Sequence, residues 1–360
     1  MNQSRPSFLI IIIRYNGDVY LTHNLIEKIV QIHINCDIDI MVDKSTENVA
    51  QLLPNVRKIL TFDYELKKKN SLSQEIQIIK QIYKKYDYGI SLTTSDRSVF
   101  YSILSAKESV SAIDEETYKN WWKKIFLNKT YFWNREIHIV ENNFQALKVL
   151  GYKIEVSPPR IIAADNETLE KIKEILRQLK IDKFIILHMP SKYIYKMYSK
   201  ENRDILLNLL SKLDIDIVAT GGKSQIDKDL SISLPNYPNL HNLIGKISIK
   251  EFYALSSLSI GYIGVDTLNI HIAASQRKKI FGIYGPTNID LWKPWSENSE
   301  NKKQKSKGVI TYDNVTIFSP DMLCAGCGRA GCDDKGTYSF CLETIDPYLI
   351  HNEVSNWLKE

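Results

Sequence analysis

The chain lacks any long apolar segment. No run of about 18 apolar residues occurs in its 360 residues, which excludes a membrane-spanning helix. The charge excess is also small, because 47 basic residues against 42 acidic ones leave a formal net charge of +5. Proteins that bind nucleic acid through their electrostatic field carry a much stronger or more clustered basic excess. We therefore expect no nucleic acid among the partners.

The chain also lacks the features of an export signal. Residues 7–13 are apolar, but the run is short, is preceded by a single arginine and is followed by no small-residue cleavage site. We expect residues 8–14 to form a buried strand and the protein to be cytoplasmic. Two lysine-rich runs, 67–69 and 302–307, have two interpretations. One is a solvated loop, and the other is a weak peripheral contact with the anionic inner membrane.

Short apolar runs alternate with segments of helical spacing along most of the chain. The expected strands include residues 8–14, 37–42, 56–62, 88–92, 184–188 and 216–219. This alternation predicts an α/β fold with doubly wound parallel sheets. A chain of this length is long for one domain. The segment Val156-Ser157-Pro158-Pro159 is the best linker, because its prolines block both helix and ladder pairing.

The linker divides the chain into two predicted domains. Residues 1–157 form the N-terminal domain, and residues 158–345 form the C-terminal domain, which includes a cysteine-rich loop at 324–341. Residues 346–360 are expected to form a terminal helix that packs back towards the N-terminal domain.

The most informative stretch spans residues 260–295. An apolar run, 259–265, leads into Asp266 and Thr267, and a helical segment with His271 inside it follows. Ligands bind at the carboxyl ends of strands in open α/β sheets, and the start of a helix offers backbone N–H groups that suit a phosphate. These residues therefore predict an anion or nucleotide site. The alternatives are that Asp266 and Thr267 only cap the helix and that His271 is structural.

The order of residues in this stretch resembles the donor-site signature of family 9 glycosyltransferases, the bacterial heptosyltransferases and their relatives. The matching residues are Gly264, Asp266-Thr267, His271, Ala273-Ala274, Phe281-Gly282, Gly285-Pro286-Thr287, Trp292 and Pro294. The family usually has glycine directly after the Asp-Thr pair, where this chain has Leu268. A side chain there would crowd a backbone that approaches the phosphates closely. In the first half, Gly17-Asp18-Val19 and Tyr86-Asp87-Tyr88 also resemble recurring stretches of the family.

The resemblance implies a GT-B fold, in which two Rossmann-like domains face a central cleft. It also implies that Asp18 is the general base, which takes a proton from the acceptor hydroxyl. The alternative for Asp18 is an N-cap of a helix that begins at Val19.

On the donor side, the resemblance implies that Lys196 neutralises the diphosphate leaving group. The alternative for Lys196 is a solvated lysine of a basic loop. Other donor-binding residues implied in the same way are Ser191, Gly221, Gly222, Ile247, Asp266, Thr267, Leu268 and His271.

Four of the five cysteines lie close together near the C-terminus, at Cys324, Cys327, Cys332 and Cys341. The first pair has the spacing of metal ligands, and four thiolates can hold Zn or Fe tetrahedrally. A structural Zn or Fe, reduced thiols and disulfides are the three alternatives. Catalysis needs no cofactor in the resembled family.

The resemblance thus implies an inverting glycosyltransferase. The expected donor is ADP-heptose, and the expected acceptor is a hydroxyl of a bacterial surface glycan, such as the lipopolysaccharide core, or of a protein. Three alternatives stay open: a transferase that uses another nucleotide sugar, a degenerate scaffold that binds a nucleotide sugar or assembles with others, and a two-domain nucleotide-sugar epimerase.

Overall fold

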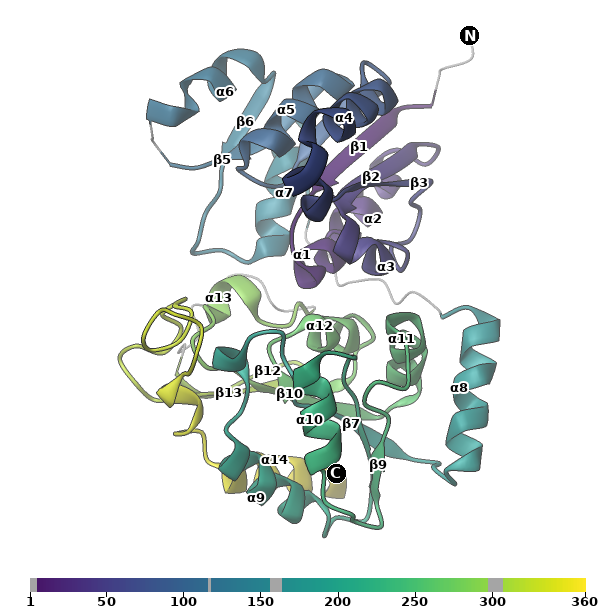
Figure 1. Ribbon diagram of the computed structural model, residues 1–360, viewed down its shortest axis with the longest axis vertical. Coiled ribbons are helices and arrows are strands. Elements are labelled where there is room, and N and C mark those ends of the chain that lie inside the picture. Colours follow the sequence, from purple (N-terminus) through teal and green to yellow (C-terminus); the bar gives the residue numbers. More distant parts are fainter. Residues whose placement is uncertain (1–4, 116–117, 156–163, 297–306) are drawn as a thin grey trace. The chain divides into compact units, whose positions relative to one another are not determined.

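The computed structural model describes residues 5–115, 118–155, 164–296 and 307–360. The chain divides into two compact units, Met1–Arg160 and Ile161–Glu360 (Figure 1). The expected linker at 156–159, with the predicted boundary at 157, lies outside the described residues, as do residues 302–306 and the side chains of 67–69. None of the described helices combines the length and the apolar character needed to cross a bilayer.

The first unit is built on a six-stranded parallel sheet in the order β3-β2-β1-β4-β5-β6. Its strands are β1 (Ser7–Ile12), β2 (Asp37–Asp43), β3 (Lys58–Phe62), β4 (Tyr86–Ser91), β5 (Ala106–Ile113) and β6 (Lys129–Phe132). The order reverses between β1 and β4, as in doubly wound nucleotide-binding folds. The strand β1 is buried along nearly its whole length, which explains its unbroken apolar sequence.

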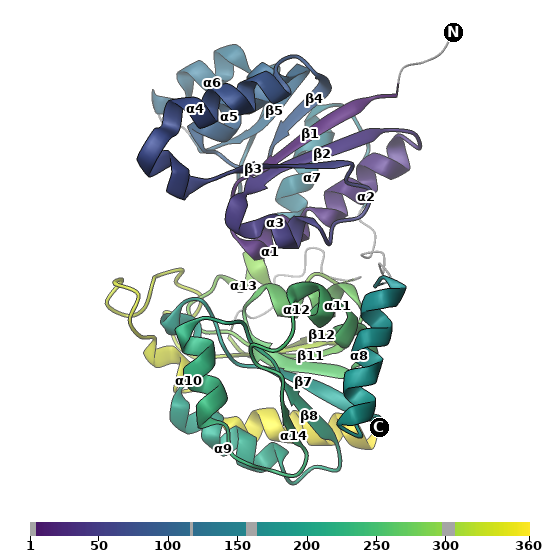
Figure 2. The ribbon, with the colours of Figure 1, turned by 45° about the vertical axis from the view of Figure 1, so that its right-hand side comes forward.

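Helices cover both faces of this sheet. Figure 2 shows α4 and α5 on one face and α2 and α7 on the other. The helices are α1 (Asn16–Leu21), α2 (His23–Ile32), α3 (Glu47–Ala50), α4 (Tyr64–Ile82), α5 (Asp96–Ser105), α6 (Trp121–Phe126) and α7 (Ile139–Val149), with 3-10 turns η1 (Lys44–Thr46) and η2 (Tyr118–Asn120).

The second unit repeats this topology. Its seven-stranded sheet has the order β12-β13-β11-β10-β7-β8-β9, with β12 antiparallel at the edge and the other strands parallel. The strands are β7 (Phe184–His188), β8 (Asp216–Ala219), β9 (Leu240–Asn242), β10 (Gly261–Val265), β11 (Lys279–Ile283), β12 (Gly308–Tyr312) and β13 (Val315–Ser319). The order reverses between β7 and β10. The predicted α/β class with doubly wound sheets is confirmed in both units.

Helices again flank the sheet, with α11 and α12 on one face and α9 and α14 on the other (Figures 1 and 2). The elements are α8 (Asn166–Gln178), η3 (Ile194–Lys196), α9 (Lys200–Leu210), α10 (Gln225–Ser233), α11 (Ile249–Leu258), α12 (Leu268–Ser275), α13 (Ile289–Trp292), η4 (Phe340–Leu342) and α14 (Pro347–Lys359).

The terminal helix α14 departs from its expected packing. Its buried residues Ile350 and Val354 belong to the core of the second unit, and the helix lies against α9. The expectation that it packs towards the N-terminal domain is therefore wrong for its buried face. An amphipathic helix buries its apolar stripe against a sheet face that is otherwise uncovered. For α14 that face belongs to its own unit.

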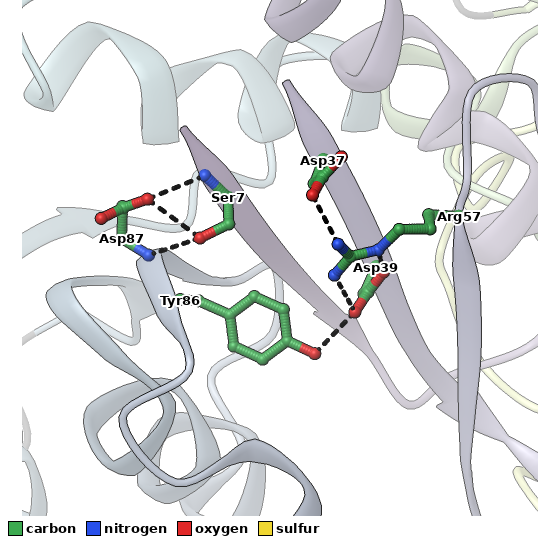
Figure 3. A network of polar contacts seen from close by, with 6 residues as sticks. All are labelled: Ser7, Asp37, Asp39, Arg57, Tyr86 and Asp87. Atoms are coloured by element: carbon green, nitrogen blue, oxygen red, sulfur yellow. Dashed lines mark hydrogen bonds and ion pairs between the residues drawn. The ribbon is translucent and has the colours of Figure 1, made fainter. Parts of the chain in front are cut away.

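A polar network joins the amino ends of neighbouring strands in the first sheet (Figure 3). The carboxylate of Asp39 on β2 is almost fully buried and accepts two bonds of 2.9 Å from the Arg57 guanidinium. The Tyr86 hydroxyl donates to the same carboxylate at 2.8 Å. Nearby, the hydroxyl and backbone N–H of Ser7 both donate to Asp87 at 2.9 Å. Burial and the bond to Asp39 raise the pKa of Tyr86 well above its ordinary value. The resembled Tyr86-Asp87 stretch therefore has a structural role.

Removing the centre of this network should destabilise the first unit. We expect Asp39→Ala to lower the free energy of unfolding by about 2–3 kcal/mol, because the buried Tyr86 hydroxyl loses its acceptor and Arg57 its bidentate partner. Asp37→Ala is the matched control, since Asp37 contacts the same Arg57 from a more exposed position and should cost less than about 1 kcal/mol. Denaturant unfolding measures both values. Equal losses for the two variants would contradict this account.

Candidate functional site

The residues predicted to bind a donor lie at one edge of the second sheet. Parallel strands end at the same edge, so the loops that follow them are brought together there. Ser191 and Lys196 follow β7, Gly221 and Gly222 follow β8, Ile247 follows β9, and Asp266, Thr267, Leu268 and His271 follow β10. The neighbours β7 and β10 are the strands between which the order reverses, which is where such folds bind ligands.

The Asp266 carboxylate is the centre of this edge. Its side chain is 9% exposed, and one oxygen, Oδ2, accepts bonds from Lys196 Nζ at 2.7 Å and from Thr287 Oγ1 at 2.8 Å. The other oxygen, Oδ1, lies 3.9 Å from Nε2 of His271. The three neighbours come from the loop after β7, the loop after β11 and the helix α12. The structure thus brings together Lys196, Asp266 and His271, as predicted.

Charges in this cluster follow from burial and from these contacts. Burial opposes ionisation of Asp266, but the Lys196 ammonium, His271 and the two hydrogen bonds outweigh it, so the pKa lies below its ordinary value. Burial lowers the pKa of His271 to about 4, although the Asp266 carboxylate opposes this shift. At neutral pH the cluster therefore contains a carboxylate, an ammonium and a neutral imidazole.

Helix α12 begins at this cluster without a side-chain cap. Thr267 occupies the N-cap position, with φ −145° and ψ 173°, yet its side chain caps no backbone N–H. Its buried hydroxyl lies near that of Tyr262 but makes no hydrogen bond of standard geometry within the described residues. Nδ1 of His271 is likewise buried without a partner there. Capping by the Thr267 side chain, the alternative interpretation, is therefore wrong, and the first N–H groups of the helix suit an anion.

Leu268, which stands where the family usually has glycine, is the first residue of α12 and is buried. Ser191 and Ile247 are also buried, and the Ser191 hydroxyl accepts a bond of 3.3 Å from the backbone N–H of Tyr193. The placement of these three residues at the same sheet edge agrees with donor binding. Their contacts with a donor stay a prediction.

Besides the predicted nucleotide contact, the structure gives a reason why positions 221 and 222 are glycine. The N–H of Gly222 donates to Asp227 at 2.8 Å, and Asp227 completes the capping box of α10 with Ser224. A Cβ on Gly221 would come within 3.0 Å of side-chain atoms of Asp227 and two other residues. The glycines therefore let the chain pass close to the start of α10.

Thr287 belongs to the matched family signature, but no role of its own was predicted for it from the sequence. It belongs to the Gly285-Pro286-Thr287 turn after β11, and its hydroxyl holds the Asp266 carboxylate. The signal that points to it is its position, because a hydroxyl residue in the loop after β11 lies at the same sheet edge as Asp266.

In the first unit, Asp18 lies at the corresponding edge. It follows β1, the strand beside the order reversal, and its side chain is 7% exposed. The helix α1 begins at Asn16, with Tyr15 as its N-cap, so Asp18 is inside the helix. The capping alternative for Asp18 is therefore wrong. Nε of Arg14 lies 3.2 Å from Asp18 Oδ1 and helps to orient the carboxylate.

The cysteine loop contains free thiols. Cys324, Cys327 and Cys332 are exposed, Cys341 is buried, and none forms a disulfide. Burial, and then the neighbouring thiols, raise the pKa of Cys341 to about 11. Across the described ranges, no three His, Cys, Asp or Glu side chains are arranged to hold a metal ion. A structural Zn or Fe at these four cysteines stays a prediction.

The buried histidines predict a pH dependence of stability. His188, like His271, has its pKa lowered to about 4 by burial. The unfolded chain, with a histidine pKa near 6.5, binds protons first as the pH falls, so the free energy of unfolding decreases from pH 6.5 towards pH 4. Each histidine should account for about 2–3 kcal/mol at pH 4.5. The lowered pKa of Asp266 adds a further loss below about 3.8.

Denaturant unfolding of the wild type and of His271→Gln at pH 7 and pH 4.5 checks this. The loss between the two pH values should be about 2–3 kcal/mol smaller in the variant than in the wild type, because the contribution of His271 is removed. An unchanged pH dependence would show that His271 is not buried in its neutral form.

Comparison with known proteins agrees with this geometry. The model of glycosyltransferase family 9 (heptosyltransferase) matches residues 76–313, well over half of the chain. Lipopolysaccharide heptosyltransferase 3 of Escherichia coli K12 is 26% identical over 300 residues, which cover 79% of this chain and 84% of that protein.

Two solved structures share the fold. A glycosyl transferase family 9 structure from Veillonella parvula has a TM-score of 0.76 at 16% identity and covers 100% of this chain and 99% of its own. The E. coli heptosyltransferase WaaC, solved with ADP, has a TM-score of 0.71 at 16% identity. The match covers 98% of this chain and 99% of the WaaC chain. The predicted family and GT-B fold are confirmed: the chain is a glycosyltransferase and belongs to family 9, the heptosyltransferase family.

Proposed function

We propose that the protein transfers heptose from ADP-heptose to a hydroxyl of a lipopolysaccharide core glycan. The observation that carries the proposal is the Asp266–Lys196–Thr287 cluster at the uncapped start of α12. Two comparisons support the finer assignment. The similar E. coli K12 protein is a lipopolysaccharide heptosyltransferase, and WaaC has been solved with ADP and with ADP-2-deoxy-2-fluoro heptose.

In this proposal, the second unit holds the donor. The backbone N–H groups at the start of α12 and the Lys196 ammonium bind the diphosphate. An ammonium has three N–H donors, and one of them is donated to Asp266. We assign the contact with a phosphate oxygen to the same ammonium. Both groups also stabilise the negative charge that grows on the diphosphate as it leaves. Asp266 has two roles: it positions Lys196, and its Oδ1 is the acceptor for a donor sugar hydroxyl.

The reaction is a direct displacement. The acceptor oxygen forms a bond to the anomeric carbon of heptose while the bond from that carbon to the diphosphate oxygen breaks, and ADP leaves. The proton of the acceptor hydroxyl passes to the Asp18 carboxylate. This base assignment is supported by the position of Asp18 at the carboxyl edge of its sheet and by the resemblance of Gly17-Asp18-Val19 to the family stretch.

The base assignment predicts a split between chemistry and binding. Asp18→Ala should lower kcat by about 10²–10⁴-fold, while the affinity for ADP stays within about twofold of the wild type. Asp18→Asn should show the same loss, because the amide keeps the shape but cannot take the proton. Transfer is followed by the mass gain of a lipopolysaccharide core acceptor incubated with ADP-heptose. Wild-type turnover in either variant would exclude Asp18 as the base.

A further inference from the structure

Tyr262 is a buried tyrosine of the second sheet that lies close to the start of α12. It stands in β10, between β7 and β11, and is 0% exposed. Successive side chains of a strand point to opposite faces of the sheet. Its neighbour Ile263 and the next residue but one, Val265, belong to the core on the face of α9 and α14. Tyr262 therefore points to the other face, which α11 and α12 cover.

The ring of Tyr262 runs along β10 towards the carboxyl end of the strand. A Cβ added to Gly264, two residues further on, would come within 2.8 Å of the Tyr262 hydroxyl oxygen and 3.0 Å of the ring. Glycine at position 264 thus makes room for this side chain. The ring also stacks with that of His188, with centroids 6.4 Å apart and planes inclined by 24°. These contacts hold the hydroxyl at the end of β10, where the chain continues into Thr267.

The hydroxyl of Tyr262 lies beside the hydroxyl of Thr267. Both oxygens are buried, and neither makes a hydrogen bond of standard geometry within the part of the chain that the structure describes. Burial raises the pKa of Tyr262 far above its ordinary value, so the phenol keeps its proton at neutral pH. A buried hydroxyl without a well-formed bond costs free energy of folding. Stability alone therefore does not explain why tyrosine, and not phenylalanine, stands here.

We propose that Tyr262 is a positioning residue for the donor diphosphate: its O–H donates to Thr267 Oγ1 and so turns the O–H of Thr267 towards a phosphate oxygen. Each hydroxyl has one hydrogen to donate, and a phenol is the stronger donor of the two. Hydrogen bonds in a chain polarise one another, which strengthens the bond to the phosphate. The inference rests on the proposed function, because it takes the diphosphate to lie at the start of α12.

Tyr262→Phe tests this role, since it removes the hydroxyl and keeps the ring. We expect the affinity for ADP to fall about five- to tenfold, because the Thr267 hydroxyl is no longer oriented, and the affinity for adenosine to stay the same. The free energy of unfolding without ligand should not fall. A purely structural role predicts the reverse, namely lower stability with an unchanged ratio of the two affinities. Isothermal titration calorimetry measures the affinities, and denaturant unfolding measures the stability.

A double-mutant cycle shows whether the effect passes through Thr267. In a Thr267→Val background, Tyr262→Phe should weaken ADP binding by less than about twofold, because the hydroxyl that it positions is already absent. Tyr86→Phe is the control for removal of a buried phenol hydroxyl. That hydroxyl donates to Asp39 in the first unit, so its loss should lower the stability and leave the ADP affinity unchanged.

Three results would overturn the inference. If Tyr262→Phe binds ADP as the wild type does, Tyr262 has no positioning role, and the donor site stands as proposed. If Tyr262→Phe causes the same loss with and without the Thr267 hydroxyl, it does not act through Thr267. If the wild type binds no ADP, the proposed function is contradicted and the inference with it.

Discussion

A buried carboxylate that must stay charged organises the edge of the second sheet. An unpaired charge in such a position would cost several kcal/mol, so Asp266 requires partners. They are supplied by Lys196 and Thr287, from loops that follow two different strands. The ion pair therefore ties three strand-end loops together around the start of α12. These contacts fix the positions of the donors that a diphosphate would meet.

The two units share a sheet topology, and each places a buried aspartate at the same point of it. Each sheet reverses its strand order beside its first strand, and each carries a buried aspartate at the carboxyl edge near that point, Asp18 in one and Asp266 in the other. In the first unit the opposite edge carries the network of Asp39, Arg57 and Tyr86, which joins strand ends by buried hydrogen bonds. In the first unit, the buried polar network thus lies at the amino ends of the strands, and Asp18 lies at their carboxyl ends.

Much of this could be predicted from the sequence, because apolar strands and helical periods are local signals. The strands at 184–188 and 216–219 lie where they were expected, and a helix that contains His271 follows Asp266 and Thr267 as expected. The sequence from Tyr118 to Ile139 has no clear period, and the structure shows there a 3-10 turn, a short helix and a short strand. Each piece is too short to show a period of 3.6 or 2.

Tertiary contacts were harder to predict. The partner of Lys196 lies 70 positions away along the chain, and no local pattern joins them. The role of Thr287 depends on the same contact. The start of α1 was misplaced by three residues, which changed Asp18 from a cap to a residue inside the helix. The start of a helix is hard to predict when its N-cap position is not Ser, Thr, Asp or Asn. In α1 the N-cap position is occupied by Tyr15.

Nucleotide binding by the purified chain tests the role of the Asp266–Lys196 cluster most directly. Thermal stabilisation would be measured with ADP, ADP-heptose, UDP and GDP, for the wild type and for Lys196→Met, with Lys192→Met from the same loop as the control. We expect selective stabilisation by ADP and ADP-heptose, of roughly 2.7 kcal/mol at 100 times the dissociation constant. We expect Lys196→Met to weaken ADP binding by about tenfold or more, and Lys192→Met to leave it unchanged. Equal binding of ADP by Lys196→Met and the wild type, or stabilisation by none of the nucleotides, would contradict this account.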